Sequence, residues 1–257
     1  MVSRRNFVKR ASILPGLLIT SHAGLPGMNA IPILSPHLDL TRDEDFWHQI
    51  KMAYTVSPTL VNLNNGGVCP APKVVQDAVE RYNKLSNETP SYYMWRILDK
   101  GRESIRKKLA ALAGCTTDEI AINRNASEAL ETVIFGLRLA PGDEIVLTKQ
   151  DYPNMINAWK QREHRDGIVL KWVDLDLPSE DENAIVKKYV EAFSDRTKVV
   201  HITHVINWMG QIIPAKKIAD EARSRNIEVV IDAAHSFAHL DYKVNELGGD
   251  YLGTSLH

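Results

Sequence analysis

Strand-like and helix-like runs alternate from about residue 119 to residue 254, and this alternation limits the possible folds more than any other feature of the chain. The strand-like runs span residues 119–123, 144–148, 168–174, 198–203, 228–232 and 250–254. The helix-like runs lie between most of them, at residues 128–139, 154–165, 182–193 and 214–225. Strands that alternate with helices at short spacing are typical of parallel sheets. The sequence therefore predicts an α/β fold in which a mainly parallel (mixed) sheet is flanked by helices.

The residues before this alternation are predicted to be mostly helical. Residues 41–44 fit a capping box for a helix that continues through residue 50. Pro72 suits the first turn of a second helix, and a third helix is predicted at about residues 102–113. A short strand-like run at residues 60–63 separates the first helix from the second.

Composition excludes several classes of protein. The 257 residues include 31 Lys and Arg against 32 Asp and Glu, so nothing favours nucleic acid as a partner. The two cysteines, Cys69 and Cys115, are too few for a disulfide framework, and no metal site is predicted. Gly-x-Gly-x-x-Gly and Walker-type loops are absent from the sequence, so it does not favour the nucleotide-binding folds that carry these motifs.

The N-terminus has the pattern of an export signal. Arg4 and Arg5 are followed by Phe7, Lys9 and a short apolar stretch that contains Pro15, which resembles a twin-arginine signal peptide. An accidental arginine pair in a tail is the alternative. Removal of residues 1–30 takes away four basic residues and no acidic ones, so the mature protein is expected to be acidic, exported to the periplasm or beyond, and free of the membrane.

Chemically informative residues follow several of the predicted strands, where open α/β sheets bind ligands. Ala126 and Ser127 begin a predicted helix, whose N–H groups and dipole suit a phosphate, although Ser127 could equally be an ordinary N-cap. Tyr152 could stack on a planar ring or simply cover a turn. Asn207 could donate to a ligand oxygen or stabilise its own turn.

Asp232 gives the sharpest signal, because an acid ends the apolar run 229–231 and His235 follows it. A carboxylate at such a buried edge needs a positive partner, and a pyridinium nitrogen is one such partner. Helix capping or an ion pair with an arginine is the alternative. The last predicted strand leads into the hydroxyl and imidazole groups of Ser255 and His257.

Together these segments match a family. The chain from about residue 40 resembles the class V aminotransferases, which are fold-type-I enzymes that depend on pyridoxal 5′-phosphate (PLP), and it looks nearest to the isopenicillin N epimerase-like branch. The likeness is carried by Leu63–Gly67, Asn125–Ala129, Asp151–Asn154, His204–Gly210, Asp232–His235 and Ser255–His257. None of these stretches is specific alone, but their order along the chain makes the match strong.

The resemblance implies a role for each matching residue. Ala126, Ser127, Ser255 and His257 would hold the phosphate of PLP, and Tyr152 would stack on its ring. Asp232 would pair with the ring nitrogen, and Asn207 and His235 would lie near the ring hydroxyl. The substrate side would be lined by Asn64, Asn65, Gly66 and Gly67.

The resemblance also implies the reaction class. The substrate would be a small amino acid or amine whose Cα proton is removed, with epimerisation, transamination or elimination as the outcome, and the full-length enzyme would be a homodimer. Cysteine desulfurases typically carry histidine where this chain has Tyr152 and glutamine where it has His235. A desulfurase-like enzyme is therefore the less favoured alternative.

The end of the chain departs from the family pattern. The family's Schiff-base lysine follows the histidine that matches His257, so the catalytic lysine is expected just beyond this sequence, together with a smaller C-terminal domain. The full-length protein is therefore expected to be the enzyme, and the chain as given is expected to bind PLP weakly and to be inactive by itself. The expected organisation is a signal peptide at residues 1–30, an N-terminal segment at residues 31–70 and an incomplete PLP-binding domain at residues 71–257. Alternatives are a truncated, non-catalytic protein that binds a cofactor or partner, and an α/β binding domain whose motif matches are coincidental.

Overall fold

The computed structural model describes residues 41–256, which fall into two units, one ending at Ile50 and one beginning at Lys51. The predicted signal peptide and His257 lie outside the described residues. Within the part described, no helix is both long enough and apolar enough to cross a membrane.

Helices make up the first part of the described chain. They are α2 (Glu44–Met52), α3 (Lys73–Glu88), α4 (Pro90–Tyr92), the π-helix η1 (Tyr93–Leu98), α5 (Asp99–Ala113) and the short 3₁₀ turn η2 (Thr117–Glu119). The expected capping box at residues 41–44 is wrong, because the side chain of Asp43 accepts the N–H of Phe46 at 3.0 Å and thereby caps α2. The helix predicted at residues 102–113 is confirmed as α5.

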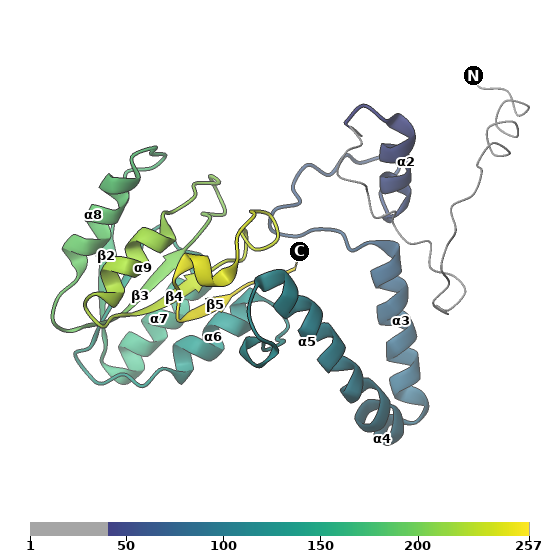
Figure 1. The fold of residues 1–257 in the computed structure, drawn as a ribbon, viewed down its shortest axis with the longest axis horizontal. Coiled ribbons are helices and arrows are strands. Elements are labelled where there is room, and N and C mark those ends of the chain that lie inside the picture. The colour runs from purple at the N-terminus through teal and green to yellow at the C-terminus, as the bar shows by residue number, and fades with distance from the viewer. Residues whose placement is uncertain (1–40, 257) are drawn as a thin grey trace, which may run out of the picture. The chain divides into compact units, whose positions relative to one another are not determined.

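A five-stranded parallel sheet forms the centre of the second unit (Figure 1). Its strands are β1 (Glu144–Thr148), β2 (Val169–Val173), β3 (Thr197–Thr203), β4 (Glu228–Asp232) and β5 (Tyr251–Gly253), in the order β2-β1-β3-β4-β5. The intervening elements are α6 (Ala126–Gly136), α7 (Pro153–Asp166), α8 (Glu182–Ala192), α9 (Ala215–Arg223) and the 3₁₀ turn η3 (Val244–Leu247). The predicted α/β architecture is therefore confirmed, and all five described strands run parallel.

The two faces of the sheet pack against different helix pairs, because side chains alternate along each strand. Val229 and Ile231 of β4 lie in the core with α8 and α9, whereas Val230 lies in the core with α6 and α7. Figure 1 shows these two helix pairs on opposite sides of the sheet. The central strands β1, β3 and β4 are thus buried on both faces, as in other parallel sheets, whereas the edge strands β2 and β5 are partly exposed.

Two predicted strands are wrong. Residues 60–63 form no strand, and Leu60, Val61 and Leu63 are between 75% and 89% exposed. At residues 119–123 the side chain of Glu119 accepts the N–H of Thr116 at 2.7 Å and closes the 3₁₀ turn instead. Local apolar composition suggested both strands, but neither segment pairs with another strand among the described residues.

The order of the strands determines where a ligand can bind. The chain runs from β1 outward to β2 and then returns to place β3 on the other side of β1. Open parallel sheets bind ligands at such a reversal, beyond the carboxyl ends of the strands. The residues that follow β1, β3, β4 and β5 are therefore brought to one edge, together with the N-terminus of α6.

Candidate functional site

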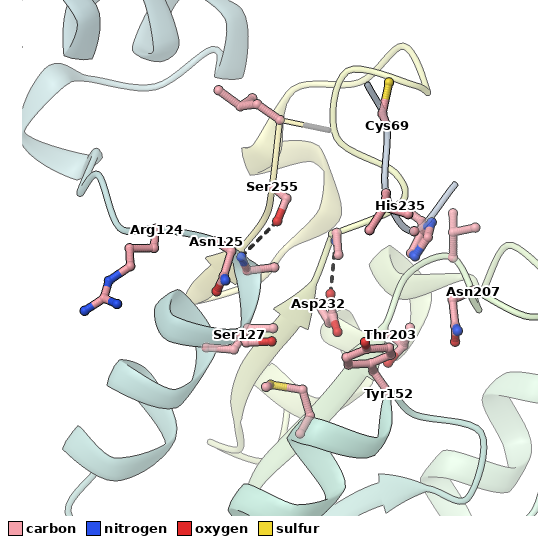
Figure 2. A pocket seen from close by; sticks show the side chains of 18 of the residues that line it. Cys69, Arg124, Asn125, Ser127, Tyr152, Thr203, Asn207, Asp232, His235 and Ser255 are labelled. Atoms are coloured by element: carbon pink, nitrogen blue, oxygen red, sulfur yellow. Dashed lines mark hydrogen bonds between the residues drawn. The ribbon is translucent and has the colours of Figure 1, made fainter. Parts of the chain in front are cut away.

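A cavity of about 830 Å³ lies at this edge of the sheet (Figure 2). Of the predicted site residues, nine line it: Asn64, Gly67, Ala126, Ser127, Tyr152, Asn207, Asp232, His235 and Ser255. Asn65 and Gly66 are not among the lining residues, although a Cβ on Gly66 would lie 3.9 Å from Cε1 of His235. The Asn65 side chain instead accepts a 2.7 Å hydrogen bond from the Asn62 side chain.

The N-terminus of α6 forms one end of the cavity. Asn125 is its N-cap, with Oδ1 accepting the N–H of Glu128 at 2.9 Å, so the alternative in which Ser127 caps this helix is wrong. The N–H of Ala126 donates to Oγ of Ser255 at 2.9 Å, which ties the start of α6 to the chain beyond β5. First-turn N–H groups have no acceptor within the helix and lie at the positive end of its dipole. This end therefore suits an anionic group such as phosphate.

Asp232 ends β4 at another part of the cavity wall and is 4% exposed. Its Oδ1 accepts the N–H of Ala234 at 3.0 Å (Figure 2). Burial raises the pKa of this carboxyl, while the charge of His201 and the hydrogen bond from Ala234 act in the opposite direction. A buried carboxylate of this kind favours a cationic ligand atom, which would restore its ionised form.

Tyr152 presents a ring to the same cavity. It stands at the N-cap of α7, immediately before Pro153, and its side chain remains 39% exposed. Because Pro153 fixes its own φ and disfavours helical backbone at the preceding residue, it holds Tyr152 outside the helix. A partly exposed aromatic ring beside Asp232 in a cavity suits stacking on a flat ligand.

Asn207 and His235 reach the cavity from the loops after β3 and β4. Val205 and Ile212 form an antiparallel bridge, and the N–H of Gly210 closes the intervening loop on the carbonyl of Ile206 at 2.8 Å. This loop exposes Asn207 while burying Ile206. His235 is half-buried, so its polar tip can reach a ligand without full loss of solvent.

Sequence reasoning missed several lining residues. The sequence could have identified Thr203, because it ends a predicted strand. In the structure its Oγ1 donates to the Asp151 side chain at 2.7 Å. Cys69 and Arg124 carried no signal, and Figure 2 shows Arg124 pointing away from the other labelled side chains. The other residues missed are Val68, Asn125, Leu130, Met155, Val205, Ala234 and Leu256.

The geometry defines a ligand by its chemistry. The first turn of α6 favours an anion, Asp232 favours a cationic atom, and Tyr152 favours a planar ring. No group of three or more His, Cys, Asp or Glu side chains that could hold a metal ion occurs among residues 41–256. The arrangement therefore suits a flat, phosphorylated molecule with a basic ring nitrogen.

Comparison with known sequences gives a family match. The family model described as Aminotransferase class-V matches residues 61–257. An isopenicillin N epimerase of Streptomyces clavuligerus is 30% identical over 212 residues, which cover 82% of this chain and 53% of the epimerase. A probable cysteine desulfurase of Halalkalibacterium halodurans is 30% identical over 225 residues, covering 82% of this chain and 54% of the desulfurase. The chain thus spans about half the length of the curated relatives it matches.

Solved structures share the fold at lower identity. The cystine C–S lyase C-DES, in complex with its reaction product cysteine persulfide, superposes with a TM-score of 0.66 at 24% identity, over 75% of this chain and 52% of that one. A mutant of C-DES holds glycine covalently linked to the PLP cofactor, with the same TM-score at 23% identity, over 75% and 51% of the two chains. The apo cysteine desulfurase from Thermococcus onnurineus NA1 has a TM-score of 0.64 at 23% identity, over 81% of this chain and 52% of that one.

Proposed function

Because this chain belongs to the class-V aminotransferase family, whose cofactor is PLP, we propose that the protein acts on an amino acid or amine by removing its Cα proton. The proposal assigns the cavity at the carboxyl ends of the strands to PLP. One observation carries this assignment: an anion site at the start of α6 and a buried carboxylate at Asp232 line the same cavity. PLP carries a phosphate and a ring nitrogen, so the described residues fit it.

Each lining residue would have a defined task. PLP, when bound, supplies an electron sink for the electrons of a broken Cα–H bond. Asp232 would keep a proton on the ring nitrogen, because a buried carboxylate is stabilised by an adjacent cation. The N–H of Ser127 and the hydroxyl of Ser255, which is itself positioned by the N–H of Ala126, would bind the phosphate and fix the position of the ring. Tyr152 would cover one ring face, and Asn207 and His235 would orient the ring hydroxyl.

The outcome of the reaction is the finer part of the proposal. Similarity to isopenicillin N epimerases supports an epimerase-like enzyme, and similarity to cysteine desulfurases of equal identity supports the alternative. Tyr152 and His235 favour the first, since desulfurases typically have histidine and glutamine at the matching positions. Asn64 and Gly67 would line the substrate side.

A homodimer is also part of the proposal. Val79 and Tyr82 of α3 and Trp95 of η1 are 65%, 48% and 73% exposed, and such apolar surface supports contact with a second copy. Sedimentation equilibrium of the full-length protein would measure its mass in solution. A monomer at all concentrations would contradict this part.

The cofactor assignment is tested by the affinity of the purified chain for PLP, measured by equilibrium dialysis and visible absorbance. Asp232→Ala is expected to lower the affinity by about 10- to 100-fold, because a hydrogen bond to a charged group contributes about 1.5–3 kcal/mol. Asp174→Ala is the matched control, since Asp174 follows β2 but is exposed, pairs with Lys149 and does not line the cavity. Equal affinities of the wild type and both variants would contradict the assignment.

The reaction class is tested separately by incubating the full-length protein and PLP with amino acids in D₂O. Deuterium at Cα, detected by mass spectrometry, would support proton removal. Chiral analysis, oxo-acid detection and sulfide detection then distinguish epimerisation, transamination and desulfuration. Substrate turnover that leaves Cα fully protonated would contradict the proposed reaction class.

A further inference from the structure

His201 on β3 is fully buried, with 0% exposure, and neither of its ring nitrogens has a hydrogen-bond partner among the described residues. A buried polar group without a partner costs on the order of 1–3 kcal/mol. Such groups are rare in native proteins, so each one calls for a physical reason. An apolar side chain of similar shape would fill the same volume without this cost.

The strand register relates His201 to the cavity. Thr203 of β3 pairs with Asp232, and His201 pairs with Val230. Because side chains two positions apart share a face of a sheet, His201 lies on the same face as Thr203 and Asp232, one residue pair further from the cavity. The ring of Trp159 on α7 stands edge-on to the imidazole, with centroids 6.4 Å apart. The side chain of His201 is thus enclosed between the sheet and α7, on the face that Asp232 shares.

Electrostatics couple His201 to Asp232. The charge of His201 is the largest influence that lowers the pKa of the Asp232 carboxyl against the effect of burial. The other buried carboxylate nearby, Asp151, already accepts the N–H of Thr148 and the hydroxyl of Thr203, each at 2.7 Å. Among the described residues, the Asp232 carboxylate accepts one hydrogen bond, from the N–H of Ala234, so it has room for a further donor.

We propose that His201 is a positioning residue for Asp232, which its ring N–H holds ionised and directed at the cavity through one bridging water. A purely structural role, as a filler against Trp159, is the alternative. The inference rests on the proposed function in one respect, namely that the cation opposite Asp232 is the ring nitrogen of PLP. His201 itself does not line the cavity and would act only through Asp232.

The first test is a double-mutant cycle on PLP affinity of the full chain. His201→Phe keeps an aromatic ring beside Trp159 and removes both nitrogens, and we expect it to weaken PLP binding about tenfold. In the Asp232→Asn background the same change is expected to have little further effect on PLP affinity, because the carboxylate with which His201 interacts is already absent. Equal losses in both backgrounds would show a structural role and overturn the inference.

A PLP analogue with a C–H group in place of the ring nitrogen sharpens this test. Wild type and His201→Phe are expected to bind the analogue equally, because the atom that Asp232 recognises is gone. His201→Gln, which retains an N–H donor, is expected to recover most of the affinity for PLP. His204→Phe is the matched control, since His204 is also buried with an unpartnered Nδ1 and lies edge-on to the ring of Tyr242. A loss that is the same for PLP and the analogue would overturn the inference.

The second test needs no cofactor. Histidine ¹⁵N NMR of the PLP-free chain is expected to show a change in the His201 ring signals on Asp232→Asn and none on Asp174→Asn. Unchanged His201 signals would overturn the inference even if PLP binds to the cavity. Changed signals in a chain that does not bind PLP would support the His201–Asp232 coupling and contradict the proposed function instead.

Discussion

At the scale of single residues, the buried carboxyl of Asp232 lowers the free energy of unfolding of the PLP-free chain. Burial raises its pKa above the ordinary 3.8, so in the folded chain the carboxyl resists ionisation. In the unfolded chain it ionises freely, and stability is therefore lost as the pH rises through the folded-state pKa. Below the unfolded-state pKa both states are protonated and this cost vanishes.

Asp232→Asn is therefore expected to stabilise the PLP-free chain at pH 8. We expect a rise in Tm of about 2–4 °C, which corresponds to about 1 kcal/mol in a domain of this size. The gain should shrink towards zero near pH 4, and saturating PLP should reverse it by stabilising the wild type more than the variant. Thermal unfolding followed by circular dichroism measures these differences. A gain that does not change with pH would contradict the role given to ionisation.

Single residues also differ in whether their place in the site can be predicted from the sequence. Asp232, Tyr152 and Ser255 could be predicted because each follows a strand-like run, and the ends of parallel strands meet at one edge of a sheet. His201 could not, because a histidine inside an apolar run looks like any buried residue of β3. Its significance comes from two unpartnered nitrogens and from the nearby Asp232, which only the packed structure reveals.

At the scale of elements, the contact between β5 and α6 positions the phosphate end of the cavity. Gly253 of β5 lies against Leu130 of α6, and a Cβ there would come within 2.7 Å of Cδ2 of Leu130. Two residues later, Ser255 accepts the N–H of Ala126. A glycine in β5 thus allows the strand to approach the helix closely enough for this hydrogen bond.

Gly253→Ala is expected to destabilise the chain by about 1–3 kcal/mol, since the added methyl overpacks a filled core. Urea unfolding measures the change, and PLP affinity is expected to fall with it because Ser255 moves. The cost should be smaller in a Leu130→Ala background, where space is available. Gly101→Ala in α5 is the control, with nothing within 4 Å of the new Cβ, and should stabilise by about 0.5–1 kcal/mol. Equal costs in both backgrounds would contradict the packing argument.

The strands also show how far secondary structure can be predicted from the pattern of apolar residues. The sequence pattern predicts both ends of each of the strands β1 to β5 within one residue, because each is a mainly apolar run bounded by turn residues. Residues 119–123 have a similar local pattern, but a strand needs a pairing partner as well as an apolar run. There the Thr116–Glu119 capping box satisfies the backbone locally and forms a 3₁₀ turn.

At the scale of the whole molecule, the cavity draws on segments from Asn64 to Leu256. No part of it exists before α6, the sheet and the loops have packed, so PLP can bind only to the folded chain. This dependence bears on export. We propose that residues 1–30, which lie outside the described structure, direct export by the twin-arginine route, which is known to carry folded proteins.

If that proposal holds, the chain folds and binds PLP before it crosses the membrane. Replacing Arg4 and Arg5 together with lysine is expected to leave the full-length chain in the cytoplasm, because the route reads the arginine pair rather than its charge. Fractionation of expressing cells followed by immunoblotting measures the distribution, and Arg10→Lys, which lies in the same segment outside the pair, should be exported as well as the wild type. Export of the double-lysine variant at the wild-type level would contradict the proposal.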